Sequence, residues 1–223
     1  MNMRTLFLVL LLLSISSVAL GQMPEKSDSA PPPAQKTEGD SSEYRQLVER
    51  AKRGDAEVDF VRLRDAYVKW QCDEEAKTDA PNREEMVAAF KAKEYAKAVE
   101  LAEVVLDYEF VNLGLHRAAE DAYRKLDNQT RADFHKTIAD KLVAALLASG
   151  DGKTAETAYR VLSIREEYFI MNQLGYAVSS QALLMIKERP YDLLSGQDKK
   201  TNKDVSIYFD IGSFFGGCKR EKK

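Results

Sequence analysis

The chain has 223 residues, of which 44% are hydrophobic, and a formal net charge of −3 from 33 basic and 36 acidic residues. This length suits one domain with short appendages, and it can bury a core without help from metal ions. Because the charge is nearly balanced, there is no basic surface to neutralise phosphates, and we expect no nucleic-acid partner.

The N-terminus has the pattern of a secretory signal peptide. Arg4 precedes a mostly apolar run at residues 6–20, and Ala19 and Gly21 place small residues before a cleavage site after Gly21. The run is shorter than the roughly 20 residues of a membrane-spanning helix, although an uncleaved anchor is the alternative. We predict that residues 1–21 are removed. The mature chain is then a soluble protein of the periplasm or the exterior, with no membrane span.

Two further segments are predicted to lie outside the folded domain. Residues 22–43 are rich in Pro, Ser and charge, so we expect a disordered linker. Residues 216–223 form a flexible basic tail that contains Cys218. An oxidising compartment would permit a disulfide bond between Cys72 and Cys218, but the tail position of Cys218 also allows both to stay unpaired.

The segment from residue 44 to about 149 has the apolar periodicity of helices. Asn82 followed by Glu85 predicts a helix start, as does Thr130 followed by Asp133. Residues 58–70 have an ambiguous period and could form a turn followed by a helix. The expected helices cover about 44–53, 82–92, 94–110, 113–126 and 130–149. Short connections between them predict helical hairpins.

Residues 90–106 (FKAKEYAKAVELAEVVL) resemble the tetratricopeptide repeat, although Phe110 stands where that repeat has a helix-ending proline. The positions that match it, some of them in a second and incomplete repeat, are Tyr95, Ala98, Leu106, Ala119 and Tyr123. The resemblance implies stacked helical hairpins, which usually build a binding surface rather than a catalytic one.

After Gly150 the pattern becomes mixed. The AYRVL run at 158–162 favours a short strand, whereas residues 166–188 (EEYFIMNQLGYAVSSQALLMIKE) look helical. Strands are predicted at 191–195 and at 205–211, where apolar and polar residues alternate.

These elements predict a mainly α (α+β) fold class: tetratricopeptide-like stacked helical hairpins with a small C-terminal antiparallel β-sheet. The predicted organisation is a single domain over residues 44–215, with a β cap from about 158 to 215.

The triplet Gly152-Lys153-Thr154 looks like the end of a phosphate-binding loop. That motif needs another glycine where Leu147 stands, and a strand before the loop, whereas a helix is expected here. We therefore interpret the segment as a helix-ending turn in which Gly150 and Gly152 adopt positive φ.

His116 and His135 are the only histidines, and they could meet across a predicted hairpin. With Glu166 or Glu167 they could form a zinc or iron site, although no tight ligand spacing supports one and both could equally be core residues. Adjacent glutamates point about 100° apart on a helix. We take these four residues and Tyr168 as candidate binding residues. We predict no catalytic residue, no metal site and no cofactor.

Several motifs together resemble the bacterial family catalogued as domain of unknown function 4919. They are LRDAY at 63–67, the hairpin that carries the two histidines, SGDGKTAETAYRV at 149–161, EEY at 166–168, Tyr191-Asp192, and YFDI at 208–211. The resemblance covers about residues 44–215. It implies an exported bacterial protein without an assigned activity, so no catalytic residue is carried over.

Two functions fit these observations. The preferred one is a non-enzymatic module that presents a helical surface to a protein or peptide partner in the bacterial envelope. The alternative is a small metal-dependent hydrolase or metal-binding protein that uses His116, His135 and Glu166 or Glu167.

Overall fold

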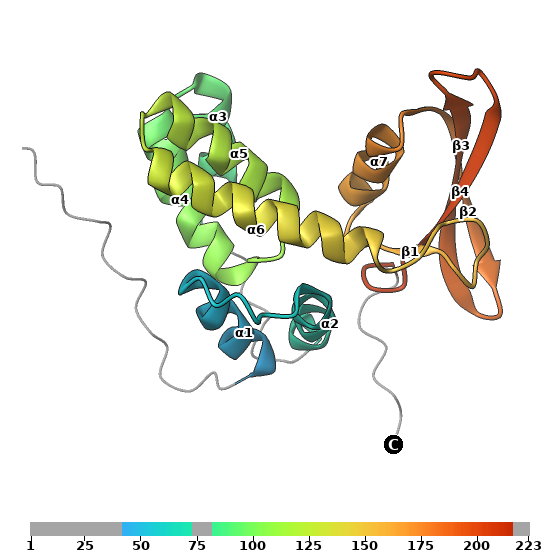
Figure 1. Ribbon diagram of the computed structural model, residues 1–223, viewed down its shortest axis with the longest axis horizontal. Coiled ribbons are helices and arrows are strands. Elements are labelled where there is room, and N and C mark those ends of the chain that lie inside the picture. The colour runs from blue at the N-terminus through green and yellow to red at the C-terminus, as the bar shows by residue number, and fades with distance from the viewer. Residues whose placement is uncertain (1–41, 73–81, 216–223) are drawn as a thin grey trace, which may run out of the picture. The chain divides into compact units, whose positions relative to one another are not determined.

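The computed structural model describes residues 42–72 and 82–215, and Figure 1 shows it as a ribbon. The predicted signal peptide, nearly all of the predicted linker and the predicted basic tail lie outside the described residues. The tail includes Cys218, so the pairing of Cys72 with Cys218 stays a prediction.

The described part contains seven helices and four strands. The helices are α1 (Glu43–Lys52), α2 (Phe60–Gln71), α3 (Arg83–Ala92), α4 (Tyr95–Tyr108), α5 (Leu113–Lys125), α6 (Gln129–Leu147) and α7 (Ile164–Gln173). The strands are β1 (Tyr159–Arg160), β2 (Tyr176–Ile186), β3 (Arg189–Asp198) and β4 (Asp204–Asp210). The predicted mainly α fold with a small C-terminal sheet is confirmed. No helix in the described part is long and apolar enough to cross a membrane.

Side-chain caps explain where several helices begin. Asp59 accepts from the amides of Val61 and Arg62, and so it satisfies two donors that the first turn of α2 leaves free. Helix α3 begins after Asn82 as predicted, although the Asn82 side chain makes no capping bond. The predicted cap at Thr130 is wrong, because Asn128 caps α6.

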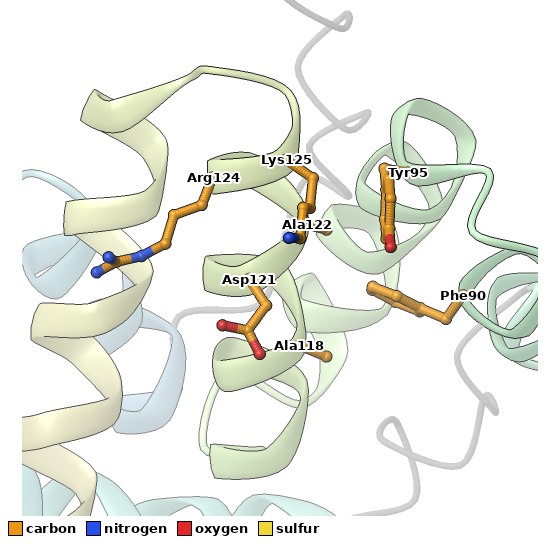
Figure 2. Close-up of a pocket in the computed structure, with 7 residues that line it drawn as sticks. All are labelled: Phe90, Tyr95, Ala118, Asp121, Ala122, Arg124 and Lys125. Atoms are coloured by element: carbon orange, nitrogen blue, oxygen red, sulfur yellow. The ribbon is translucent and has the colours of Figure 1, made fainter.

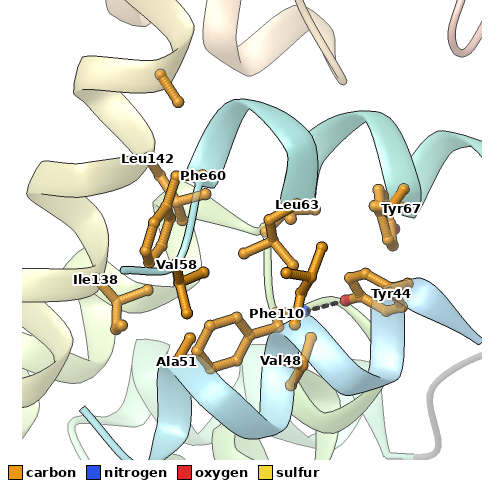
Figure 3. Packing of buried hydrophobic residues seen from close by; sticks show 14 of the residues in the cluster. Tyr44, Val48, Ala51, Val58, Phe60, Leu63, Tyr67, Phe110, Ile138 and Leu142 are labelled. Carbon is orange, nitrogen blue, oxygen red and sulfur yellow. Dashed lines mark hydrogen bonds between the residues drawn. The ribbon is translucent and has the colours of Figure 1, made fainter. Parts of the chain in front are cut away.

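The largest hydrophobic core lies among α1, α2 and α6 (Figure 3). Tyr44 is completely buried there, and its hydroxyl accepts from the amide of Phe110 at 2.9 Å. Leu63 of α2 and Leu142 of α6 are also fully buried in this core. This hydrogen bond and the shared core connect Phe110, just after α4, to α1 and α2.

Two smaller apolar clusters hold the remaining helices together. One joins α3, α4 and α5 through Met86, Leu106 and Leu115. The other joins α4, α5 and α6 through Val99, Ala119 and residues around them. The predicted helical hairpins are therefore present.

The sheet has the strand order β1-β4-β3-β2. Strand β3 pairs antiparallel with both neighbours, but β1 pairs parallel with β4, so the sheet is mixed rather than antiparallel throughout as predicted. Helix α7 packs on one face, where Ile170 and Met171 are buried with Leu194 and Phe209. Strand β2 lies at one edge of the sheet.

The prediction that residues 166–188 are helical is wrong in its second half. Helix α7 ends at Gln173, Gly175 has a φ of +80°, and β2 follows directly. Strand β2 pairs with β3 along its length, through a turn in which Lys187 and Glu188 have positive φ. This cross-strand pairing overrides a local sequence that could also form a helix.

Candidate functional site

The two histidines meet across the α5–α6 hairpin. His116 and His135 are completely buried, and their Nδ1 atoms lie 3.0 Å apart. Nε2 of His116 bonds to the carbonyl oxygen of Phe110 at 2.9 Å, and Nε2 of His135 lies 3.0 Å from Oε1 of Glu103 on α4. One chain of hydrogen bonds therefore ties three helices together.

The groups at the two ends of this row of hydrogen bonds determine which ring nitrogens donate and which accept. A carbonyl oxygen only accepts, so Nε2 of His116 donates to Phe110. Burial, and then the neighbouring His135, lower the pKa of His116 to about 3, so its ring is neutral and its Nδ1 accepts from His135. Nε2 of His135 faces the carboxylate of Glu103. Every ring nitrogen therefore has a partner.

Glu103 collects three donors. Its Oε1 accepts from the Tyr123 hydroxyl at 2.8 Å, from Arg131 and from His135. Burial would raise the pKa of Glu103, but the hydrogen bonds from His135 and Arg131 outweigh it and hold this pKa at about 2. The Tyr123 ring also stacks on His135, with centroids 5.4 Å apart. We call His116, His135, Glu103, Tyr123 and Arg131 the histidine network.

Glu166 faces α2. Its two oxygens accept from the guanidinium of Arg64 at 2.8 and 2.9 Å, and both side chains are buried. Glu166 also accepts from the amide of Leu162, while Arg64 also donates to the carbonyl oxygen of Arg160. The ion pair is bidentate, and further hydrogen bonds complete it. It joins two motifs of the family resemblance, LRDAY and EEY.

Glu167 faces the sheet instead, as expected for neighbours on a helix. It is completely buried beside Asp192 of β3, which is 5% exposed. Nε2 of Gln181 on β2 lies 2.7 Å from Oδ2 of Asp192 and 3.4 Å from Oε2 of Glu167. Among the described residues, Oε1 of Glu167 has no hydrogen-bond partner although it is buried. We call Glu167 and Asp192 the acid pair.

The acid pair holds a proton at neutral pH. Burial, and then the charge of Asp192, raise the pKa of Glu167 to about 8. A side-chain hydrogen bond with Asp192 also contributes to raising this pKa. Gln181 lies over them, and its Oε1 accepts from the hydroxyl of Tyr168 at 3.1 Å. The acid pair therefore lies just beneath a surface formed by two exposed side chains.

The five candidate residues do not form one site. His116 and His135 bond to each other, Glu167 and Tyr168 are linked through Gln181, and Glu166 pairs with Arg64. Neither glutamate is among the partners of the histidines. In the part of the chain that the structure describes, no group of three His, Cys, Asp or Glu side chains could hold a metal ion. The metal-dependent alternative therefore has no ligand set there.

Sequence reasoning missed Glu103 and Arg131 of the histidine network, and it also missed Gln181 and Asp192 around Glu167. The sequence did contain a signal for Asp192, because this residue belongs to a motif of the family resemblance and lies two positions before Leu194, on the same inner face of β3. No sequence signal pointed to Gln181 once its segment was predicted to be helical. Glu103 lies on a helix with many charged residues, and only the fold identifies it as the partner of His135.

The Gly152-Lys153-Thr154 segment is a self-contained turn. The amides of Asp151 and Gly152 donate to the carbonyl of Thr157, and the amide of Lys153 donates to the carboxylate of Asp151. A Cβ on Gly152, which has a φ of +68°, would lie 2.6 Å from the side chain of Ile207. Packing and turn geometry thus explain this glycine, in agreement with the interpretation as a turn. The expectation of a positive φ at Gly150 is wrong, because only Gly152 of the two adopts one.

A separate pocket of about 550 Å³ opens between α3, α4 and α5. Figure 2 shows the rings of Phe90 and Tyr95 facing α5 across it. The residues that α5 contributes are Ala118, Asp121, Ala122, Arg124 and Lys125. We call this the helical pocket. Its combination of two rings, an alanine floor and a charged rim was not identified from the sequence.

Comparison with known proteins gives one match. A family model described as "Domain of unknown function (DUF4919)" matches residues 34–217, which include the histidine network, the acid pair and the helical pocket. No curated protein and no solved structure matches the chain.

Proposed function

Because the chain belongs to the DUF4919 family, whose description gives no activity, we propose a function from the geometry of the structure and from the sequence of the N-terminus. The protein is a non-enzymatic, exported binding module. It holds a segment of a partner protein in the helical pocket between α3, α4 and α5.

The observation that carries this proposal is the pair of aromatic rings beside an apolar floor. Phe90 and Tyr95 are half-buried, so each keeps part of its ring open to a ligand. Ala118 and Ala122 of α5 leave room opposite them. Aromatic side chains at the wall of a concave surface are the usual anchors of protein-binding sites.

The rim of the helical pocket indicates which segments would fit. Arg124 forms an ion pair with Glu120 at 2.9 Å, whereas no ion pair is seen for Lys125 or Asp121 within residues 42–72 and 82–215. Lys125 is exposed and can take an acidic group. We expect the partner segment to carry an apolar or aromatic side chain next to an Asp, a Glu or a C-terminal carboxylate.

Peptide display tests this proposal. The mature chain, immobilised, is used to select binders from a random peptide library, and the affinities of the selected peptides are measured. Tyr95→Ala and Lys125→Glu should each weaken them by about tenfold or more, because each removes a main anchor. Lys200→Glu, a matched charge reversal in the β3–β4 turn, should not change them. Absence of enriched peptides, or binding indifferent to both pocket variants, would contradict the proposal.

Export is the second part of the proposal and rests on the signal-peptide pattern of residues 1–21. When the full chain is expressed in a bacterium, the protein recovered from the periplasm or the medium should begin at Gln22. Recovery of an intact N-terminus from the cytoplasm would contradict export.

A further inference from the structure

The acid pair is the buried polar cluster for which packing gives no explanation. The neighbouring Glu166 is matched by the guanidinium of Arg64 in a bidentate ion pair. Glu167 has instead a hydrogen bond with a second acid, Asp192, and a single amide donor from Gln181. A buried oxygen without a partner, Oε1 of Glu167, destabilises a fold by roughly 1–3 kcal/mol. Buried polar groups without partners and with shifted pKa values are concentrated at functional sites.

The chemistry of the acid pair favours a cationic ligand. Two carboxyl groups offer four acceptor oxygens, and in the described structure Gln181 satisfies one oxygen well and another weakly. An ammonium or guanidinium group would supply several donors and a positive charge, and it could reach the free Oε1. A divalent metal ion fits less well, because the described residues give it no third His, Cys, Asp or Glu ligand.

Strand β2 offers the route by which a cationic side chain would reach this site. It is an edge strand, and the described residues provide no partner for its outer backbone groups. None of its residues, Tyr176–Ile186, is charged, although charges are a common protection of free edges. Leu183 and Met185 share a face with Gln181 and are 51% and 58% exposed. Leu183 pairs directly with Asp192 in the sheet.

These features together fit an extended peptide that adds a strand to the sheet. Main-chain hydrogen bonds to β2 would give affinity, and alternate side chains would contact the face that carries Gln181. Apolar residues of such a peptide would cover Leu183 and Met185, and a basic residue on the same face, beside Gln181, would lie above the acid pair.

We propose that the acid pair is the receptor for a Lys or Arg side chain, carried by an extended peptide of a partner protein that pairs with the free edge of β2. This site is distinct from the helical pocket, and neither proposal depends on the other.

Binding exchanges one cation for another. The proton of Glu167 leaves for solvent as the basic side chain enters, so the net charge of the site is conserved. Because burial and Asp192 raise the pKa of Glu167 to about 8, protons compete with the ligand below that pH, and affinity should rise with pH. Asp192 of β3 and Gln181 of β2 face Glu167 from the sheet, while on α7 the adjacent Glu166 is already paired with Arg64.

The test uses the mature chain and two fluorescein-labelled peptides of alternating Val and Thr, one with a central Arg and one with citrulline in its place. Citrulline has nearly the shape of arginine without the charge. Fluorescence anisotropy should give about tenfold tighter binding of the Arg peptide, and its affinity should rise by up to about tenfold per pH unit below pH 8. Amide chemical shifts in ¹⁵N-labelled protein should change along β2.

Two variants separate the acid pair from general charge effects. Glu167→Gln should abolish the preference for Arg over citrulline. Glu188→Gln removes an exposed carboxylate from the β2–β3 turn, and it should leave the preference intact.

The proposal would be overturned if neither peptide bound saturably up to roughly 1 mM, or if the two peptides bound with equal affinity. It would also be overturned if the preference for Arg survived Glu167→Gln, or if the chemical-shift changes were confined to the helical pocket. If the Arg peptide binds only after residues 216–223 are deleted, the occupant is the chain's own basic tail, and the assignment to a partner protein is wrong.

Discussion

The histidine network and the acid pair bury similar polar groups, but they satisfy them differently. In the network, each ring nitrogen of His116 and His135 has a partner, and Glu103 accepts three hydrogen bonds. In the acid pair, two carboxyl groups face each other, and one oxygen of Glu167 has no partner among the described residues.

This difference separates structural roles from binding roles. A fully satisfied buried network rigidifies the helices that contribute to it, whereas an unsatisfied one destabilises the fold. The histidines were the more attractive candidates in the sequence, yet their geometry explains them as a structural link. Glu167, one of the two adjacent glutamates, is instead the residue with unexplained chemistry.

The largest expected effect comes from the satisfied neighbour of the acid pair. Arg64→Ala would leave Glu166 buried without its cation, and the free energy of unfolding should fall by about 3–5 kcal/mol. Chemical denaturation measures this change. Asp65→Asn is the matched control, because it breaks an ion pair with Arg160 whose side chains are both 50% exposed. Its effect should stay below about 1 kcal/mol. Equal effects would show that burial of Arg64–Glu166 contributes little.

Within the histidine network, Glu103→Ala should lower the free energy of unfolding by about 2–4 kcal/mol. The substitution leaves Tyr123, Arg131 and His135 without their common acceptor. Tyr123→Phe removes one of the three donors and should lower it by about 1 kcal/mol. If denaturation shows no loss for Glu103→Ala, the network is not a structural link.

The two clusters should make the free energy of unfolding depend on pH in opposite directions. The pKa of His116 falls from 6.5 to about 3 on folding, so the unfolded chain binds the extra proton and stability drops as pH falls below 6.5. The pKa of Glu167 rises from 4.5 to about 8, so the folded chain keeps the extra proton and stability drops as pH rises from 4.5 to 8. Each slope is at most about 1.4 kcal/mol per pH unit.

These slopes oppose each other between pH 4.5 and 6.5, where the unfolding free energy of the wild type should be nearly flat. In that window Glu167→Gln should show stability that rises with pH, and His116→Gln should show the reverse. Urea denaturation at several pH values measures all three curves. Parallel curves for the three proteins would mean that neither residue is linked to folding in this way.

The sequence predicted the helices well because their signals are local. Apolar periodicity marked α4, α5 and α6, and the short connection after α5 placed the two histidines on one hairpin. The meeting of His116 with His135 followed from that hairpin. Their third partner, Glu103, did not, because it comes from another helix hairpin.

Strand β2 and the acid pair were missed for a common reason. Whether residues 176–186 form a helix or a strand is decided by pairing with β3, which the local sequence does not encode. Without that strand, nothing places Gln181 over Glu167 or Asp192 beside it. The family motifs EEY and Tyr191-Asp192 gave the residues, and only the sheet joined them.

The most direct test of the contrast between the two clusters is the unfolding free energy of Glu167→Gln at pH 8 and at pH 4.5, beside the wild type. An amide removes the repulsion with Asp192, so we predict that the variant is more stable by about 1–3 kcal/mol at pH 8 and nearly equal at pH 4.5. A variant less stable than the wild type at pH 8 would contradict the account. Glu167 would then be a satisfied structural residue like those of the histidine network.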